Sequence, residues 1–316
     1  MRLYKIGFML WLCVSAVNAL AQIATLKSPD EKIAFQWWMT EGRLYFEVTK
    51  AGVPVIEKSP LVFSIDGKVL TADCTVFASQ SYEVNETYAV RGVHAQAVNQ
   101  ANGLKMKMKS NSDKDFTVEA RAYNDGIAFR LLYSGKPGMK LVPDEQTTFV
   151  LPAGSRMWYH DMYAHYEGIH QQKEITEVKE GEWAAPPVTV ELPESQGYAC
   201  ITEAALKNYA GMSLQADGQC GLVTRLGHAQ PAGYPFAHDY SLEEAVRLSV
   251  PAAIEGDILT PWRSIIIAND LNELVNTDLI TNLSPAPDKK LFPRGVHTDW
   301  VKPGRSVWCW LDGGER

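Results

Sequence analysis

One carboxylate in this sequence is set apart by the residues on either side of it. Glu203 follows an apolar run that begins at Tyr198, and it precedes a second apolar run from Ala210 to Leu214. Such runs form buried strands, where a carboxylate is costly unless a partner satisfies it. From the residues alone, that partner is an arginine such as Arg130 or Arg225. The alternatives are a role as a calcium ligand or as a glycosidase carboxylate.

A second candidate site is the aromatic segment from Met157 to Glu167. Trp158, Tyr163 and Tyr166 carry flat apolar rings with polar tips, and such rings suit a ligand that is apolar on its faces and polar at its edges. The segment is therefore a candidate for contact with sugar rings. Plain packing of aromatic side chains between two sheets is the alternative interpretation.

Three histidines in the same region recur every five residues, at His160, His165 and His170. This spacing places the three side chains on no common face of a helix or of a strand. We therefore expect polar-tipped rings in a loop rather than a metal site. The sequence contains no phosphate-binding loop, no G-x-S-x-G elbow and no zinc-binding pair.

The elements that must position these residues are strands. From Ile23 to about Val150, short runs alternate apolar with polar residues and are separated by turn signals, a pattern typical of an all-β sandwich. Leu104 to Lys109 predicts a half-exposed strand near a sheet edge, because its lysines share one face. The nearly continuous apolar run from Gly126 to Tyr133 predicts a central strand, in which Arg130 needs a carboxylate partner.

Later segments continue the pattern. Strands are expected at Val188 to Leu192, Gly221 to Leu226, Ala245 to Val250 and Ser264 to Ala268. Asn269 and Asp270 then predict the cap of a short helix from Leu271 to Val275.

Composition limits the classes of partner. The chain has 316 residues, 46% of them hydrophobic, which is enough for a substantial core. Its 30 basic and 37 acidic residues leave a net charge of −7, and no basic run occurs. Nucleic acid and anionic membranes are therefore not expected as partners.

The N-terminus has the pattern of a secretory signal peptide. Arg2 and Lys5 precede an apolar run from Ile6 to Val17, and Ala19-Leu20-Ala21 forms a cleavage site after which Gln22 begins the mature chain. We therefore expect residues 1–21 to be removed and the protein to be periplasmic or secreted. No later run reaches the ~20 apolar residues of a membrane span.

The mature chain has four cysteines, at Cys74, Cys200, Cys220 and Cys309. Four cysteines spread over the whole chain are too sparse for a disulfide scaffold, and free buried thiols are the expectation. A bond between Cys200 and Cys220 is the alternative, since the compartment permits it.

Taken together, several stretches resemble the N-terminal part of glycoside hydrolase family 97, the secreted α-glucosidases and α-galactosidases of gut Bacteroidetes and related bacteria. The resemblance is carried by Tyr123-Asn124-Asp125-Gly126-Ile127-Ala128-Phe129-Arg130, Ile201-Thr202-Glu203-Ala204, Tyr209-Ala210-Gly211-Met212, Thr260-Pro261-Trp262-Arg263 and Thr298-Asp299-Trp300-Val301-Lys302-Pro303-Gly304-Arg305-Ser306-Val307-Trp308.

The resemblance implies a β-supersandwich, related in fold to galactose mutarotase, over residues 22–284. It implies a linker and the first strand of a (β/α)8 barrel over residues 285–316. It also implies that Glu203 is one ligand of a calcium ion at the domain junction, while the catalytic carboxylates come from a barrel that this sequence does not contain. The expectation is then an incomplete chain, inactive alone, with Glu203 at an uncovered surface beside the Val307 to Leu311 strand.

Two other functions are compatible with the residues. A free-standing carbohydrate-binding module would use the surface from Trp158 to Tyr166. An aldose 1-epimerase would need a histidine and a glutamate on one concave face, and it rests on fold analogy alone.

Overall fold

The computed structural model describes residues 21–90, 94–112, 114–162, 169–230, 246–295 and 299–306. The chain divides into two compact units, Met1–Leu283 and Ser284–Arg316. The first unit is built almost entirely of antiparallel strands, which confirms the all-β sandwich. Residues 284–295 and 299–306 of the second unit form no helix or strand, and the expected strand from Val307 to Leu311 lies outside the described residues.

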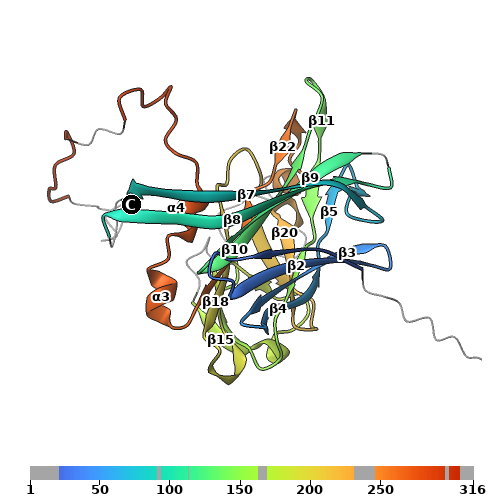
Figure 1. The fold of residues 1–316 in the computed structure, drawn as a ribbon, viewed down its shortest axis with the longest axis horizontal. Coiled ribbons are helices and arrows are strands. Elements are labelled where there is room, and N and C mark those ends of the chain that lie inside the picture. Colours follow the sequence, from blue (N-terminus) through green and yellow to red (C-terminus); the bar gives the residue numbers. More distant parts are fainter. Residues whose placement is uncertain are drawn as a thin grey trace, which may run out of the picture. The chain divides into compact units, whose positions relative to one another are not determined.

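A ten-stranded sheet dominates the first unit (Figure 1). Its strands follow the order β15-β14-β17-β18-β23-β10-β9-β8-β7, and β22 also pairs with β10. The bounds are β7 (Thr75–Ala89), β8 (Gln96–Lys109), β9 (Asp115–Tyr123), β10 (Gly126–Tyr133), β14 (Arg156–Tyr159), β15 (Gln171–Glu174), β17 (Val188–Glu191), β18 (Tyr198–Ala204), β22 (Ile258–Leu259) and β23 (Trp262–Ala268).

Four smaller sheets complete the unit. A meander joins β1 (Ala21–Lys27), β2 (Ile33–Thr40), β3 (Arg43–Lys50) and β4 (Val53–Pro60). A second four-stranded sheet has the order β13 (Thr148–Val150), β20 (Gly221–Leu226), β19 (Met212–Ala216) and β16 (Trp183–Ala184). The other two contain β12 (Pro143–Glu145), β5 (Phe63–Ile65) and β6 (Lys68–Val69), and β11 (Lys140–Leu141) with β21 (Ile254–Glu255).

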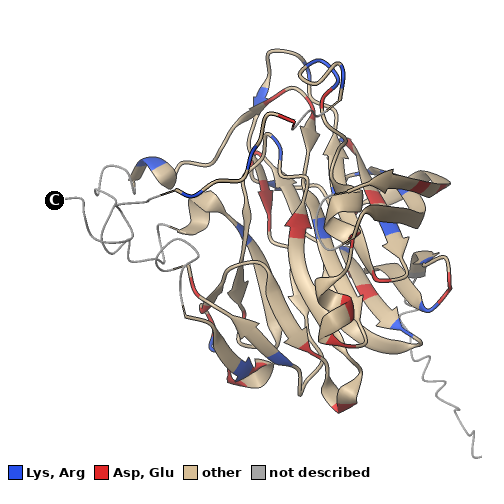
Figure 2. Cartoon of the chain, turned by 90° about the vertical axis from the view of Figure 1, so that its left-hand side faces the viewer, with Lys and Arg blue, Asp and Glu red and all other residues tan. Residues whose placement is uncertain are grey.

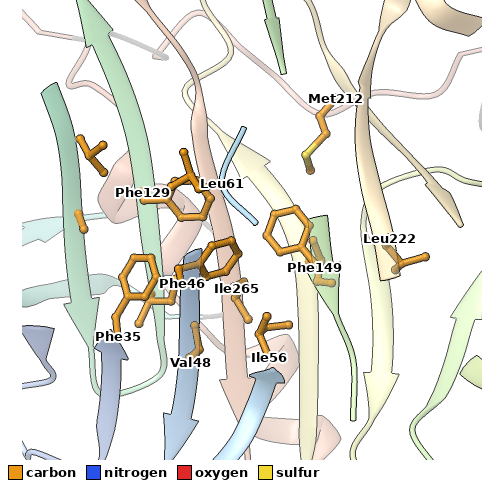
Figure 3. Close-up of a cluster of buried hydrophobic side chains, with 14 of the residues drawn as sticks. Phe35, Phe46, Val48, Ile56, Leu61, Phe129, Phe149, Met212, Leu222 and Ile265 are labelled. Carbon is orange, nitrogen blue, oxygen red and sulfur yellow. The ribbon is translucent and has the colours of Figure 1, made fainter. Parts of the chain in front are cut away.

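The main core lies between one face of the large sheet and the smaller sheets, and we call that face the inner face (Figure 3). Phe35 and Phe46 of the meander, Phe129 of β10 and Phe149 of β13 are fully buried and lie near one another. The ring centroids of Phe35 and Phe129 are 5.8 Å apart, and those of Phe46 and Phe149 are 6.0 Å apart. Aromatic rings at these separations attract one another beyond their burial.

The strands of the large sheet have the positions that their residue patterns predict. β8 lies beside the edge strand β7, with Leu104, Met106 and Met108 buried and Lys107 and Lys109 exposed. β10 lies in the interior of the sheet, between β9 and β23. Both predictions are confirmed. Over residues 104–109 the apolar side chains are buried on the inner face and the lysines lie on the outer face.

Short helices lie against the opposite, outer face of the large sheet. α3 (Leu271–Val275) contacts β18 and β23, and α4 (Leu279–Leu283) also contacts β8 (Figure 1). The predicted cap of α3 is confirmed, because the Asp270 carboxylate accepts a hydrogen bond of 2.8 Å from the Glu273 N–H. Leu279 and Leu283 pack into a second apolar cluster with Trp262.

One predicted strand is wrong. Residues 246–248, inside the expected strand from Ala245 to Val250, are helical. Val246 and Val250 are exposed, so this segment has no apolar face buried against a sheet, and burial of one face is what would hold it as a strand.

Charged residues of both signs are spread over the described part of the chain. Acidic and basic residues are interspersed over the strands and their turns (Figure 2). No helix among the described residues is long and apolar enough to cross a membrane.

Candidate functional site: a glutamate–arginine–glutamate cluster

Glu203 lies at the end of β18, where the chain leaves the large sheet. Its neighbour across the β18–β23 ladder is Arg263, and their side chains extend the inner face on which Ile201 and Ile265 are buried. Glu203 therefore lies where the apolar core between the sheets ends. A segment of residues 205–211 then carries the chain from β18 to β19 of a smaller sheet.

Arg263 is held between two carboxylates. Its Nε and Nη2 donate to the two oxygens of Glu145, at 2.9 and 2.7 Å, and its Nη1 donates to Glu203 Oε2 at 2.5 Å. The side chains of Arg263 and Glu145 are completely buried, whereas that of Glu203 is 16% exposed. A buried guanidinium is tolerated only with this kind of bidentate pairing, because its desolvation is expensive.

The cluster carries a surplus of negative charge. Two carboxylates face one guanidinium, and two of the three donor nitrogens of Arg263 are bonded to Glu145. Glu203 gains one further donor, the Met212 N–H, at 3.1 and 3.3 Å from its two oxygens. An ionised carboxylate has about four acceptor positions. Glu203 therefore keeps acceptor capacity on its exposed side.

Neighbouring groups keep the charges of the cluster in place. Burial opposes the charge of Arg263, but the carboxylate of Glu145 outweighs it and raises the pKa of the guanidinium. The ring of Tyr209 lies 6.0 Å from the Arg263 guanidinium carbon. Burial, and then the charge of Glu145, raise the pKa of the Tyr209 hydroxyl, so it remains a neutral phenol.

The arginine that pairs with Glu203 is not one of the two named from the sequence. Arg130 pairs instead with Glu119, at 2.7 Å, and Arg225 Nε donates to Gln215 at 3.0 Å. The expectation of an arginine partner is confirmed, but both named candidates were wrong. The partner is set by the register of β18 against β23, which brings together two residues that are 60 positions apart in the sequence. The expectation that Arg130 needs a carboxylate is confirmed.

Sequence reasoning missed Glu145 and gave Arg263 no role. Arg263 lay in a quoted stretch, Thr260-Pro261-Trp262-Arg263, and a buried-strand arginine there was the available signal. Glu145 gave no comparable signal, since it follows an aspartate in a segment with the composition of a surface turn.

Calcium at Glu203 remains a prediction that the described residues fit in one respect only. Glu203 offers a partly exposed carboxylate with surplus charge, which suits a cation. Calcium takes roughly 6 to 8 oxygens, however. Over the described ranges, no group of three or more histidine, cysteine, aspartate or glutamate side chains is placed to hold a metal ion.

The aromatic candidates are only partly described. Trp158 lies half-buried on β14, while Tyr163, Tyr166 and His165 lie outside the described residues. Trp158 faces Thr189, which in turn faces Cys200 on β18. Cys200 and Glu203 are three residues apart, so they point to opposite faces of the sheet. Trp158 and Glu203 are therefore on different faces.

Two of the three histidines do meet. The ring centroids of His160 and His170 are 4.9 Å apart, because these residues directly follow β14 and precede β15 in one hairpin. His160 Nδ1 lies 2.5 Å from the carbonyl oxygen of Asp161. The sequence argument considered only a single helix or strand, so it missed that two paired strands could bring His160 and His170 together.

The cysteines offer no nucleophile in the described structure. Cys74, Cys200 and Cys220 are free thiols, so Cys200 and Cys220 do not pair, and Cys309 lies outside the described residues. Burial raises the pKa of Cys74 to about 12 and that of Cys200 to about 11. Both stay protonated at neutral pH.

Comparison with known proteins supports both the fold and the family resemblance noted in the sequence. The family described as "Glycosyl-hydrolase 97 N-terminal" matches residues 26–285. A retaining alpha-galactosidase of Bacteroides thetaiotaomicron is 26% identical over 98% of this chain and 48% of its own length. A probable retaining alpha-galactosidase of Streptomyces bingchenggensis is 26% identical over 87% of this chain and 39% of its own. The chain thus spans about half or less of these relatives.

Solved structures show the same fold. A Glycoside Hydrolase Family 97 enzyme from Pseudoalteromonas sp. strain K8, solved with panose and with acarbose, superposes with a TM-score of 0.74 at 21% identity, over 89% of this chain and 40% of that one. A beta-arabinopyranosidase superposes with a TM-score of 0.70 at 18% identity, over 84% of this chain and 43% of that one. Since the family match covers most of the sequence, the chain belongs to glycoside hydrolase family 97, and residues 26–285 are its N-terminal domain.

Proposed function

We propose that this chain is the N-terminal part of a secreted, retaining α-glycosidase, in which Glu203 supplies one ligand of a calcium ion and other ligands come from residues outside this sequence. α-Galactosides are the first candidate substrates, because both curated relatives are named for that activity. α-Glucosides are the second, because a solved relative was studied with panose and acarbose.

The observation that carries the calcium role is the charge of the glutamate–arginine–glutamate cluster. Arg263 is already satisfied by Glu145, so Glu203 retains charge and acceptor capacity at an exposed position. Had Glu203 alone been paired with Arg263, the two charges would have cancelled. Calcium binding by this chain alone should still be weak, since one carboxylate is far from a complete coordination shell.

The same cluster is unsuited to glycoside hydrolysis. A glycosidase needs one protonated carboxyl group and one free carboxylate, both in reach of the sugar. Glu145 and Glu203 are both bonded to Arg263, and Glu145 is fully buried. We therefore expect the catalytic carboxylates to come from outside this sequence and the isolated chain to be inactive.

Two further parts of the proposal rest on residue chemistry. Trp158, Tyr163 and Tyr166 would form a wall of the carbohydrate pocket, through ring faces that suit sugars. Residues 1–21 would direct the protein to the periplasm or the medium.

Calcium titration of the mature chain tests the proposal. For a dissociation constant of about 1 mM, ten-millimolar calcium should raise the melting temperature by roughly 2–4 °C. Glu203→Gln should abolish the rise, and Glu57→Gln, at an exposed glutamate of β4, should keep it. An equal rise in melting temperature in both variants would mean that Glu203 is not a calcium ligand.

Hydrolysis assays test the expectation that the isolated chain is inactive. The mature chain should release no sugar from a nitrophenyl α-galactoside or α-glucoside. If the wild type releases sugar and Glu203→Gln does not, this chain carries out the hydrolysis itself. That result would contradict the proposal that the catalytic carboxylates lie outside this sequence.

A further inference from the structure

Two strand edges bound a groove of about 720 Å³ on the first unit. β7 is the outermost strand of the ten-stranded sheet, and β1 is the outermost strand of the meander (Figure 1). The groove is lined by residues 25–27 of β1, by the turn that follows β1, by residues 81–83 of β7, and by Asn102 and Gly103 of β8. Strand edges carry backbone N–H and C=O groups that can pair with a further strand.

The hairpin of β7 and β8 determines which backbone groups of β7 point outward. Where the hairpin closes, the Val90 N–H donates to the Ala95 carbonyl at 3.1 Å. Bonded and non-bonded pairs alternate along an antiparallel ladder, so Tyr82 and Gly103, an even number of residues further on, are a bonded pair. The residues between the bonded positions turn their backbone groups away from β8, and these are Ser81, Glu83, Asn85 and Thr87.

This outward row is open, whereas the facing edge is partly closed. The residues of the row are exposed, and within the described part of the chain their outward backbone groups form no hydrogen bond. At ~3.4 Å per residue, the row presents roughly 20 Å of edge. On β1, by contrast, the Lys27 carbonyl already accepts from Asn102 Nδ2 at 2.9 Å. β7 is therefore the edge that can take a further strand.

β7 lacks most of the features that prevent such pairing. Lysine, proline and bulges are the usual ones. β7 contains no lysine or proline, and its register shift lies near its start, between Val76 and Ala78. Its charged residues are Glu83, which lines the groove, and Glu86. Lys27 on the facing wall is paired with Glu31 at 3.4 Å, so it leaves the charge of Glu83 in place.

These charges discriminate between two kinds of occupant. A second copy of this chain, paired β7 to β7, would bring Glu83 and Glu86 of both copies together, and the strand has no lysine or arginine to offset them. A strand that carries lysine or arginine would instead place a positive charge opposite Glu83. Charge complementarity therefore favours a basic segment from another polypeptide.

We propose that this groove is a docking site for an extended, basic peptide segment of another protein, which adds a strand to the β7 edge. In this mode of recognition, main-chain hydrogen bonds supply affinity and alternate side chains supply specificity. In antiparallel pairing, a basic residue directly opposite Glu83 shares its face of the sheet and exchanges backbone hydrogen bonds with it. The proposal is independent of the calcium role of Glu203.

Fluorescence anisotropy of the mature chain with a labelled peptide in which lysine alternates with valine tests the proposal. This peptide should bind, and the same peptide with glutamate for lysine should bind about tenfold more weakly. Glu83→Lys should reverse that preference. Methylation of the lysine amides removes the donors that face β7 and should abolish binding. Methylation of the valine amides, which face away, should leave binding within about threefold.

Matched variants test the edge itself. Ser81→Pro removes an outward N–H without removing a bond to β8, and it should weaken binding about tenfold. Ser81→Ala keeps that N–H and should stay within about threefold of wild type. No binding of the lysine peptide, or equal binding of the two methylated peptides, would overturn the docking site. The methylated peptides leave the protein unchanged, so they decide the matter even if Ser81→Pro does not fold. Dimerisation of the wild type that Ser81→Pro abolishes would assign the edge to a second copy and contradict the proposal.

Discussion

Two glutamate–arginine clusters lie on opposite faces of the same ten-stranded sheet, and their residual charges are opposite. On the inner face, Glu145 and Glu203 share Arg263. On the outer face, Glu119 is 2% exposed and pairs with Arg130 at 2.7 Å and with Lys105 at 3.5 Å. The inner cluster has one carboxylate too many, and the outer cluster has one cation too many.

The surroundings of the two clusters also differ. The guanidinium carbon of Arg130 lies 4.2 Å above the ring of Trp262, and that of Arg121 lies 5.1 Å from the same ring. The outer cations are therefore satisfied partly by an aromatic face. In the inner cluster, Arg263 is held by two carboxylates, its nearest ring is the more distant Tyr209 at 6.0 Å, and the cluster opens to solvent at Glu203. The same pairing chemistry thus leaves an excess of positive charge on one face of the sheet and an excess of negative charge on the other.

The largest expected effect is the loss of Arg263. Arg263→Met leaves two adjacent carboxylates without their cation, and the free energy of unfolding should fall by about 3–5 kcal/mol. Arg130→Met should cost less, about 1–3 kcal/mol, because Glu119 keeps Lys105 and the Tyr82 hydroxyl and because Arg130 is partly exposed. Urea unfolding of both variants measures the difference. Equal losses would mean that the inner cluster is no more dependent on its arginine than the outer one.

Removing one inner acid should sharpen the contrast. Glu145→Gln leaves Arg263 to neutralise Glu203, so the calcium-dependent rise in melting temperature should largely disappear although Glu145 is not a ligand. We expect about 1–3 kcal/mol of destabilisation. Glu119→Gln is the matched control, since it removes a similarly buried acid beside an arginine. It should keep the calcium response, and a loss there would contradict the assignment of the surplus charge.

Sequence and structure agree best where local patterns decide the outcome. The faces of Leu104 to Lys109, the central position of β10 and the Asp270 cap each depend on neighbouring residues, whose chemistry can be read directly. The resemblance to family 97 was carried by short stretches of the same kind.

The inner cluster was only half predictable. Glu203 was found because a carboxylate at the end of an apolar strand is locally anomalous. Its partner Arg263 depends on which distant strand pairs with β18 and in which register, and no local pattern encodes that. Glu145 lies on a third strand, β12, in another sheet. The sugar-contact hypothesis stays a prediction, since Tyr163 and Tyr166 lie outside the described residues.

The outer cluster should also respond to acid. Burial opposes ionisation of Glu119, but the charge of Arg130 and the Tyr82 hydroxyl hold its pKa below the ordinary 4.5. Because the folded pKa is the lower one, this stabilisation is present above pH 4.5 and is lost as pH falls through the folded value. The free energy of unfolding of the wild type should therefore fall steeply as the pH drops below 4.5. The same series in Glu119→Gln should have a shallower slope, and an unchanged slope would place the acid sensitivity elsewhere.

The smallest expected effects compare one tyrosine hydroxyl from each cluster. Tyr82→Phe removes the group that bridges Glu119 and Arg121, so unfolding should become easier by about 1–1.5 kcal/mol. The buried Tyr209 hydroxyl has no hydrogen-bond partner within the described part of the chain. Tyr209→Phe should therefore be neutral or slightly stabilising, because no bond is lost and no polar atom stays buried. A loss as large as that of Tyr82→Phe would show that Tyr209 bonds to Glu145 in solution, and the surplus charge at Glu203 would then depend on three groups around Arg263 rather than two.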